Sequence, residues 1–248
     1  DITVDDIKNG TSESRNDTTF SPRAGLIYKP QENVSLYLSY SESFLPRSGE
    51  QFKSLSASSA RLDPDVFEST EIGMKVALSD SMSLTGAFFD SEQVRAARDN
   101  DTGETSEIRG LTVDGFEIEL KGRVSNSLNL AIAYSDLSGE TSSGGIPREI
   151  PEFILSGFAA WEVNEKLSVA LGITQQGESK IKDNTPNLVL PEYTRVDLSA
   201  YYSITPGLSL QMNVENLMDE LYFPHSHSTH QASVGESVNS RVSLRWTY

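Results

Sequence analysis

Apolar and polar residues alternate along much of the chain, and the stretch 207–248 shows the pattern most clearly. Every second residue is apolar in 208–214 and again in 242–248, which ends on the aromatic pair Trp246 and Tyr248. A period of two predicts β-strands that have one apolar and one polar face. Aromatic rings at a strand end suit a membrane interface, where one side of the ring is wet. The stretch therefore predicts the closing hairpin of a membrane β-barrel.

A short polar turn followed by the pattern apolar-Ser/Asn-apolar recurs along the chain. It occurs at 32–36, 80–84, 126–130, 165–169 and 206–210. The repeats are about 40 to 48 residues apart, which leaves room for two strands, one tight turn and one long loop. The repeat therefore predicts a series of hairpins joined by loops.

Eleven full strands and one partial strand at 1–7 are predicted from this pattern. The full strands are expected at 19–29, 34–44, 67–78, 82–94, 110–124, 128–137, 152–163, 167–176, 192–204, 208–217 and 237–248. The long loops are expected at 45–66, 95–109, 138–151, 177–191 and 218–236. Short turns at one end and long loops at the other are typical of outer-membrane barrels. We expect an all-β, antiparallel up-and-down barrel in which residues 1–248 form a single barrel region.

Two soluble all-β folds are alternatives to this interpretation. A β-propeller also repeats every 40 to 45 residues or so, but each of its blades needs four strands and each period here supplies two. A soluble barrel would turn its apolar face inward and its polar face to water. The polar positions include Glu117, Glu119, Lys121, Arg241 and Arg245. A wide aqueous lumen accepts such charges without the cost of burying them, which favours the membrane barrel.

Composition excludes several classes of partner and binding site but adds little about the fold. The 248 residues include 20 basic and 36 acidic side chains, a net charge of −16, which argues against nucleic acid as a partner. The absence of cysteine removes disulfides and Cys-based zinc sites. No run approaches eighteen apolar residues, so no transmembrane helix is expected. The sequence begins without the basic and apolar regions of a signal peptide, so we expect either a processed chain or a fragment.

Several blocks resemble the carboxy-terminal half of the TonB-dependent outer-membrane siderophore receptors. These blocks are Ser21 to Pro30, Ser35 to Pro46, Leu62 to Lys75, Asp114 to Leu120, Leu190 to Leu198 and Asn216-Leu-Met-Asp219 with Tyr222. Ser228-Thr-His230 resembles the catecholate-siderophore receptors in particular. The resemblance covers nearly the whole chain.

The resemblance implies a 22-stranded barrel in the bacterial outer membrane, occluded by a plug domain that binds the TonB complex. About twelve strands and no plug are present here, so we expect a fragment of a longer receptor, with a complete short barrel as the alternative. The implied ligand is a ferric siderophore, of catecholate type. The implied partners are the TonB complex, through a plug domain not present in this chain, and outer-membrane lipid. No enzymatic cofactor is expected.

The candidate ligand-binding residues lie in or near the long loops. A ferric catecholate is a bulky polyanion with aromatic faces, so guanidinium and aromatic groups suit it by charge and stacking. The candidate substrate-binding residues are Phe44, Arg47, Arg98, Arg109, Tyr222, His225, His227 and His230. Arg61 and Arg95 lie in the same regions. The alternative for the arginines is ordinary pairing with nearby acids, and for the histidines a polar loop that carries them without a role.

Three histidines could also bind a metal or haem iron, but a short irregular loop seldom holds three ligands without supporting contacts, so no metal site is expected. The chain has none of the common catalytic motifs, and we expect no enzyme. The remaining alternatives are an outer-membrane adhesin or structural barrel with partner-binding acidic loops, and a TonB-dependent receptor for haem or cobalamin.

Overall fold

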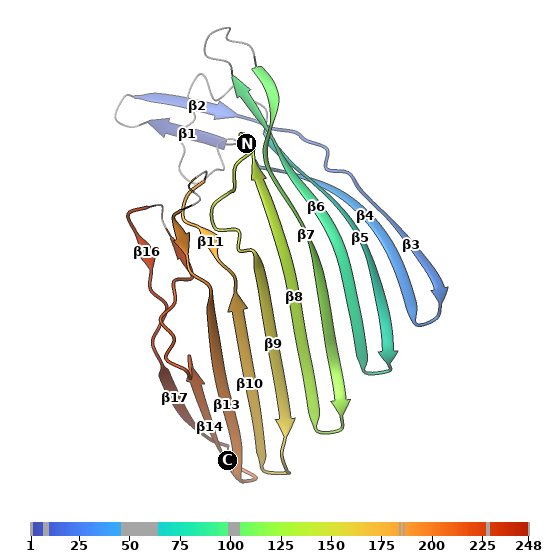
Figure 1. The fold of residues 1–248 in the computed structure, drawn as a ribbon, viewed down its shortest axis with the longest axis vertical. Coiled ribbons are helices and arrows are strands. Elements are labelled where there is room, and N and C mark those ends of the chain that lie inside the picture. Colours follow the sequence, from blue (N-terminus) through green and yellow to red (C-terminus); the bar gives the residue numbers. More distant parts are fainter. Residues whose placement is uncertain are drawn as a thin grey trace.

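The computed structural model describes residues 2–6, 10–45, 64–98, 105–183, 185, 187–226 and 229–247. Most of these residues belong to one antiparallel sheet of eleven strands (Figure 1). Its strands are β3 Arg23–Gln31, β4 Val34–Leu45, β5 Asp65–Ser79, β6 Met82–Arg98, β7 Thr105–Ser125, β8 Leu128–Thr141, β9 Phe153–Glu162, β10 Leu167–Gln176, β13 Tyr193–Thr205, β14 Leu208–Glu215 and β17 Asn239–Trp246. Consecutive strands of this set are neighbours in the sheet, which confirms the eleven predicted strands and their up-and-down order.

The structure differs from the prediction at the ends of the strands. The segment 95–109 was predicted to be a loop, but β6 continues to Arg98 and β7 begins at Thr105. The pattern missed these strand ends because 95–109 is rich in charged and polar residues and lacks the alternation of a half-buried strand, whereas backbone pairing continues there without it. The predicted strand at 1–7 is present as β1 Ile2–Asp6, but it pairs with β2 Thr11–Arg15 in a separate two-stranded sheet.

Two of the predicted long loops contain small hairpins. β11 Ser179–Lys180 pairs with β12 Val189–Leu190, and β15 His225–Ser226 pairs with β16 Ala232–Ser233. Among the residues that the structure describes, there is no helix long and apolar enough to cross a membrane.

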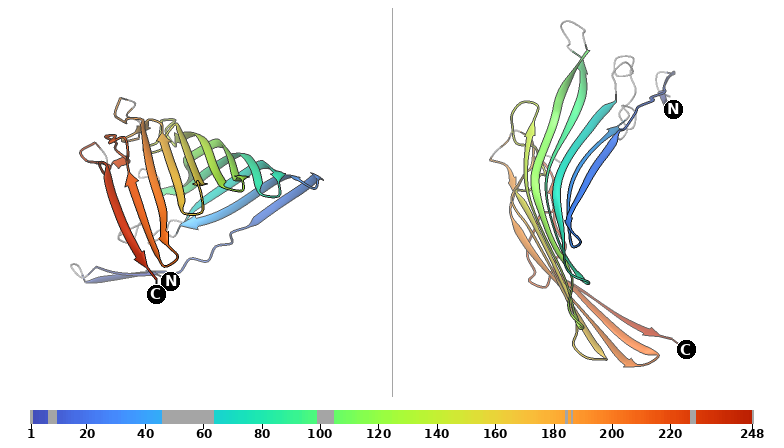
Figure 2. Two further views of the ribbon diagram at one scale, coloured as in Figure 1. Left: turned by 90° about the horizontal axis from the view of Figure 1, so that it is seen from below. Right: turned by 90° about the vertical axis from the view of Figure 1, so that its right-hand side faces the viewer.

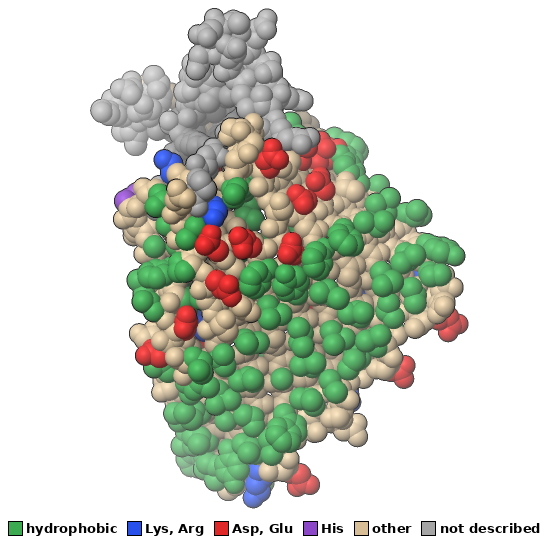
Figure 3. All heavy atoms as spheres, viewed as in Figure 1, with side chains coloured by type: hydrophobic (Ala, Val, Ile, Leu, Met, Phe, Trp, Pro, Cys, Tyr) green, Lys and Arg blue, Asp and Glu red, His purple; other side chains and the backbone are tan. Residues whose placement is uncertain are grey.

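The large sheet is curved like part of a barrel wall, and its convex face is apolar (Figures 2 and 3). The strand register places Val76, Leu84, Leu120 and Ile132 side by side across β5 to β8. Ile72 is 59% exposed and Phe88 is 67% exposed. A contiguous apolar surface of this kind needs an apolar environment. The buried hydrophobic residues found in the described part of the chain are few: Ala87, Leu190, Val214 and Tyr222.

Aromatic residues border this apolar belt at both ends. Toward the loops, Phe88, Phe116, Tyr134 and Phe153 form a chain of ring contacts with centroids 5.9, 5.7 and 6.0 Å apart. Toward the turns, the exposed aromatic residues on the same face are Tyr28, Trp161, Tyr202 and Trp246. An apolar band between two aromatic girdles is the surface of an outer-membrane barrel.

The opposite, concave face carries charged residues along the strands, as the alternation predicted. Lys75, Thr85 and Glu119 lie side by side across β5, β6 and β7. Glu119 also forms an ion pair with Lys121 at 2.5 Å. Charges on this face are compatible with an aqueous lumen.

An acidic rim lies on the convex face between the loop-side girdle and the loops (Figure 3). Its members in the described strands include Glu42, Glu68, Asp90, Glu92 and Asp114. The register sets Glu42, Glu68 and Glu92 directly opposite one another on β4, β5 and β6. Like charges opposite one another destabilise a sheet.

Replacing the central carboxylate of this rim should therefore stabilise the barrel. We expect Glu68→Gln to raise the free energy of unfolding by about 0.2–1 kcal/mol at low salt. The gain should shrink at high salt, because exposed charges are screened. Thermal unfolding of the purified protein at two ionic strengths measures this gain, and Glu162→Gln, at the turn end of β9, is the matched control. An unchanged or lower unfolding temperature of Glu68→Gln at low salt would show that repulsion among the rim carboxylates does not destabilise the sheet.

Candidate functional site at the loop end of the sheet

The structure places the predicted ligand-binding residues in three separate parts of the molecule. Phe44 lies on β4, on the same side as Leu36 and Leu38 by strand alternation, and is 37% exposed. Arg98 ends β6 and Arg109 lies on β7, and for both only the backbone is described. The predictions for Arg47, Arg61 and His227 lie outside the described residues. The structure does not bring Phe44 close to Tyr222, because β5 to β10 and β13 lie between β4, which carries Phe44, and β14, which precedes the loop of Tyr222.

His225 and His230 belong to the β15–β16 hairpin and its connection. Both are exposed, and His225 Nε2 lies 2.8 Å from the hydroxyl oxygen of Ser233 on the paired strand. Within the described residues, no three His, Asp or Glu side chains are grouped in a way that could hold a metal ion. The hairpin therefore presents two imidazoles at the loop end as hydrogen-bonding groups.

Tyr222, also predicted to contact ligand, is buried at 7% exposure. Its ring lies 4.7 Å from the ring of Tyr193, and its hydroxyl accepts a hydrogen bond from Arg195 Nη1 at 3.3 Å. A Cβ atom on Gly235 would lie 2.2 Å from the Tyr222 ring, so glycine is required there for the ring to pack. Tyr222 therefore anchors the last loop to β13, and only a rearrangement of that loop would expose its ring to a ligand.

Asn216 organises the same region and was not among the predicted site residues. It is 1% exposed, and its backbone N–H donates to Asp197 Oδ1 at 2.9 Å. Its side-chain Nδ2 donates to the carbonyls of Glu220 and Glu236, and its Oδ1 accepts from the backbone N–H of Glu220, all at 2.9 Å. The block Asn216-Leu-Met-Asp219 could have identified this turn, because Asn and Asp tolerate the left-handed φ of 51° found at both positions.

Arg195 and Asp197 complete this anchor on β13. Arg195 Nη2 forms an ion pair with Asp197 Oδ2 at 2.8 Å, and Arg195 Nε donates to the same oxygen at 3.2 Å. The other oxygen of Asp197 holds Asn216, so one carboxylate joins the arginine to the turn. A charge-assisted network of this kind fixes geometry well. These contacts fix the start of the loop 218–236, which carries His225, to β13.

An acidic pocket of about 210 Å³ lies on the concave wall, away from the loops. Its lining includes Tyr37, Glu71, Glu117 and Glu119. The Tyr37 hydroxyl donates to Glu71, and the Tyr37 ring occupies the space that a side chain on Gly73 would fill. The pocket lining is therefore acidic, although Glu71 accepts from Tyr37 and Glu119 pairs with Lys121.

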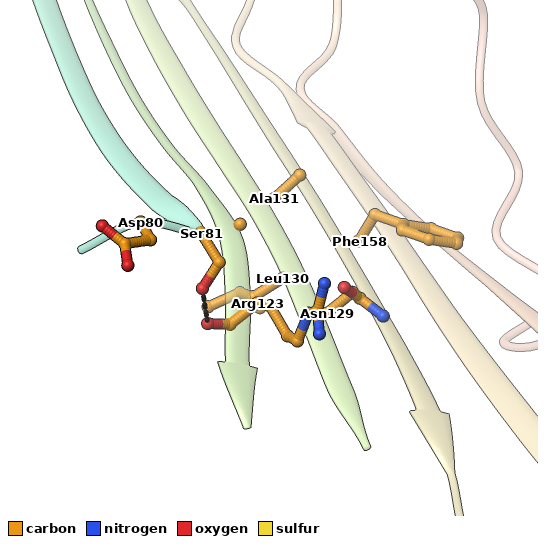
Figure 4. A pocket seen from close by; sticks show the side chains of 8 residues that line it. Asp80, Ser81, Arg123, Asn129, Leu130, Ala131 and Phe158 are labelled. Atoms are coloured by element: carbon orange, nitrogen blue, oxygen red, sulfur yellow. Dashed lines mark hydrogen bonds between the residues drawn. The ribbon is translucent and has the colours of Figure 1, made fainter. Parts of the chain in front are cut away.

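A further hollow, of about 400 Å³, lies at the turn end of the sheet (Figure 4). There the Ser81 hydroxyl donates to the carbonyl of Arg123 at 3.3 Å, and Phe158 and Asn129 line the same hollow. Gly122 has a φ of 144°, and a Cβ atom there would lie 2.0 Å from the Ser81 carbonyl oxygen. The backbones of Gly122 and Ser81 therefore lie close together beside this hollow. The hollow is at the opposite end of the strands from the histidines.

Comparison with known proteins identifies the architecture. Residues 1–217 match the family model described as "TonB dependent receptor-like, beta-barrel". The chain is 26% identical over 251 residues to the probable TonB-dependent siderophore receptor PiuA of Acinetobacter baumannii, covering 91% of this chain and 33% of that protein. The crystal structure of PiuA superposes with a TM-score of 0.79 at 25% identity, over 91% of this chain and 35% of that one.

Two further relatives bind differently named ligands. The ferripyoverdine receptor of the Pseudomonas aeruginosa outer membrane matches with a TM-score of 0.78 at 26% identity, over 95% of this chain and 34% of that chain. The catecholate siderophore receptor Fiu of Escherichia coli is 27% identical over 220 residues, which is 81% of this chain and 29% of that protein. The chain thus spans about a third of the length of the curated relatives that it matches.

These relatives are receptors, so the chain belongs to a receptor family rather than an enzyme family, as the sequence predicted. The family match also explains the belt on the convex face, because barrels of this family reside in the bacterial outer membrane with that face toward lipid. An eleven-stranded curved sheet, an apolar belt between aromatic girdles and a family model that matches residues 1–217 lead to one conclusion: the chain belongs to the TonB-dependent receptors and forms part of their β-barrel.

Proposed function

We propose that this chain is the barrel wall and outer-loop region of a receptor that imports a ferric siderophore of catecholate type. The observation that carries the proposal is the placement of exposed His225 and His230 on an anchored loop at the loop end of a TonB-dependent receptor barrel. Imidazole N–H groups donate to the phenolate and carbonyl oxygens of a ferric catecholate. The likeness to the catecholate siderophore receptor Fiu supports this ligand class.

The barrel itself carries out no covalent chemistry in this proposal. Its outer loops capture the ligand and its wall surrounds the path inward, while a plug domain outside this chain responds to the TonB complex. Two features support a larger assembly. In the described residues β3 and β17 each have one unpaired edge, and an unpaired backbone edge in lipid costs several kcal/mol per group. The acidic pocket with Glu71 and Glu117 would bind Lys or Arg side chains of the plug.

The ligand class is tested by binding measurements on the receptor expressed from its complete gene and purified in detergent. We expect isothermal titration calorimetry to give a submicromolar Kd for a ferric catecholate, and a ferric hydroxamate of similar size to bind far more weakly. Preference for the hydroxamate would reject the catecholate type and keep the receptor function. Absence of binding to any ferric chelate, together with unchanged iron uptake in a deletion strain, would reject the import function.

The two described histidines should contribute directly to this binding. We expect the double variant His225→Ala and His230→Ala to weaken ferric catecholate binding by about tenfold or more, since hydrogen bonds to charged groups are worth about 1.5–3 kcal/mol each. Gln231→Ala, exposed in the same loop, is the matched control and should leave affinity unchanged. Equal affinity of the double variant and the control for the ferric catecholate would show that the two histidines do not contact the ligand.

A further inference from the structure

Three outer loops are joined to one another at the end of the sheet where the histidines lie. They are the segments 142–152, 177–192 and 218–236, which follow β8, β10 and β14. Figure 1 shows β11 and β16, from the second and third of these loops, at the same end of the sheet. Several hydrogen bonds run between the segments, and two of them involve Glu149 of the first loop.

Glu149 contacts both of the other loops, each through a different part of the residue. Its backbone N–H donates to the carbonyl of Lys180 at 2.8 Å. Its carboxylate oxygen Oε1 accepts a hydrogen bond from the backbone N–H of Ser226 at 2.8 Å, across 77 positions of sequence. One residue therefore joins segments that follow three different strands of the sheet.

The backbone of Glu149 adopts a strained conformation while its carboxylate makes this contact. Glu149 has a φ of 56°, in the left-handed region that residues other than glycine seldom adopt. The neighbouring Arg148 forms a β-bridge to Lys180 and donates its N–H to Asp183 Oδ1 at 2.7 Å. Pro147 and Pro151 on either side are buried. A strained residue that its surroundings hold in place is often one with a specific task.

The receiving side of the contact is sheltered from water. Ser226 is 7% exposed, and its hydroxyl donates to the carbonyl of Ile181 at 3.4 Å, so the second and third loops also touch each other. A carboxylate that accepts from a sheltered backbone N–H makes a hydrogen bond of the strong, charge-assisted kind. Ser226 directly follows His225, whose imidazole lies against Ser233.

We infer that Glu149 is a latch that holds the histidine hairpin against the two preceding loops, so that the three loops behave as one body. The Tyr222 and Asn216 contacts fix the base of the last loop, and Glu149 fixes its hairpin. Glu149 is thus a positioning residue for His225. This last step rests on the proposed function, whereas the latch itself depends only on the contacts between the loops.

Hydrogen–deuterium exchange tests the latch in the receptor expressed from its complete gene, without ligand. We expect Glu149→Ala and Glu149→Gly to accelerate exchange of the amides of His225, Ser226, Ala232 and Ser233 by roughly tenfold or more. Glu149→Gln keeps an accepting oxygen and should stay closer to the unaltered receptor. Glu152→Ala removes an exposed acid from the same loop and is the matched control.

Two results would overturn the latch. If Glu149→Gly leaves the hairpin protected, the backbone of Glu149 and not its carboxylate holds the loops. If Glu149→Ala accelerates the amides of β9 as much as those of the hairpin, Glu149 acts on general stability.

Ligand binding separates the latch from the proposed function. With the hairpin loosened in Glu149→Ala, affinity for the ferric catecholate should fall while Glu152→Ala keeps it. A loosened hairpin with unchanged affinity would leave the latch in place and reject the positioning of His225 for ligand.

Discussion

Asn216→Ala should detach the final loop from the sheet and destabilise the receptor by about 3–4 kcal/mol. The substitution leaves the carbonyls of Glu220 and Glu236 and the N–H of Glu220 without the partner they have now. An unsatisfied buried polar group costs about 1–3 kcal/mol, and such costs are not fully additive. Alanine at a φ of 51° adds strain that asparagine tolerates.

Thermal unfolding in detergent, together with limited proteolysis of the last loop, measures this loss. Asn129→Ala, at an exposed position on β8, is the matched control and should change stability by less than about 0.5 kcal/mol. Asn216→Gly accepts the left-handed φ but lacks the amide, so it should lose nearly as much stability as Asn216→Ala. Full stability of the glycine variant would show that backbone conformation, and not the amide hydrogen bonds, holds this turn.

Met74→Arg should impair folding of the barrel into lipid by about 2–4 kcal/mol, the cost of an arginine near the middle of the lipid-facing band. Met74 lies on the convex face of β5 between Ile72 and Val76, and its register partners are Leu36 and Gly86. A guanidinium there would have lipid chains around it, with no partner charge on the neighbouring strands at the same level.

The same arginine on the other face is the matched comparison. Thr85 lies on the concave side, in register with Lys75 and Glu119, so the arginine of Thr85→Arg meets one like and one opposite charge and is solvated by water instead of lipid. Urea titration of the receptor in lipid vesicles, followed by heat-modifiable gel migration, compares the two. Equal destabilisation by both substitutions would contradict the assignment of the convex face to lipid.

The alternation of apolar and polar residues was sufficient to predict the eleven long strands, their order and the polarity of the two faces. A period of two is a local property, and a one-residue error would exchange the faces, so the pattern is strongly constrained. The short turns were predictable for the same reason, since Asp80-Ser81 and Pro206-Gly207 interrupt the pattern where the chain must reverse. Asn216 was visible in the sequence as part of a family motif, but its structural role was not.

The loop end was decided by tertiary structure alone. Nothing local to Glu149 indicates a left-handed backbone or a contact with Ser226, because both depend on loops that follow other strands. From the sequence, Tyr222 was predicted to be an aromatic residue available to a ligand. Its ring is buried because it packs against Gly235 and Tyr193, which only the tertiary structure places next to it. The sequence by itself determined the barrel wall, since lipid and water act on each residue separately. The arrangement of the site required the structure, because contacts between distant loops have no period from which to predict them.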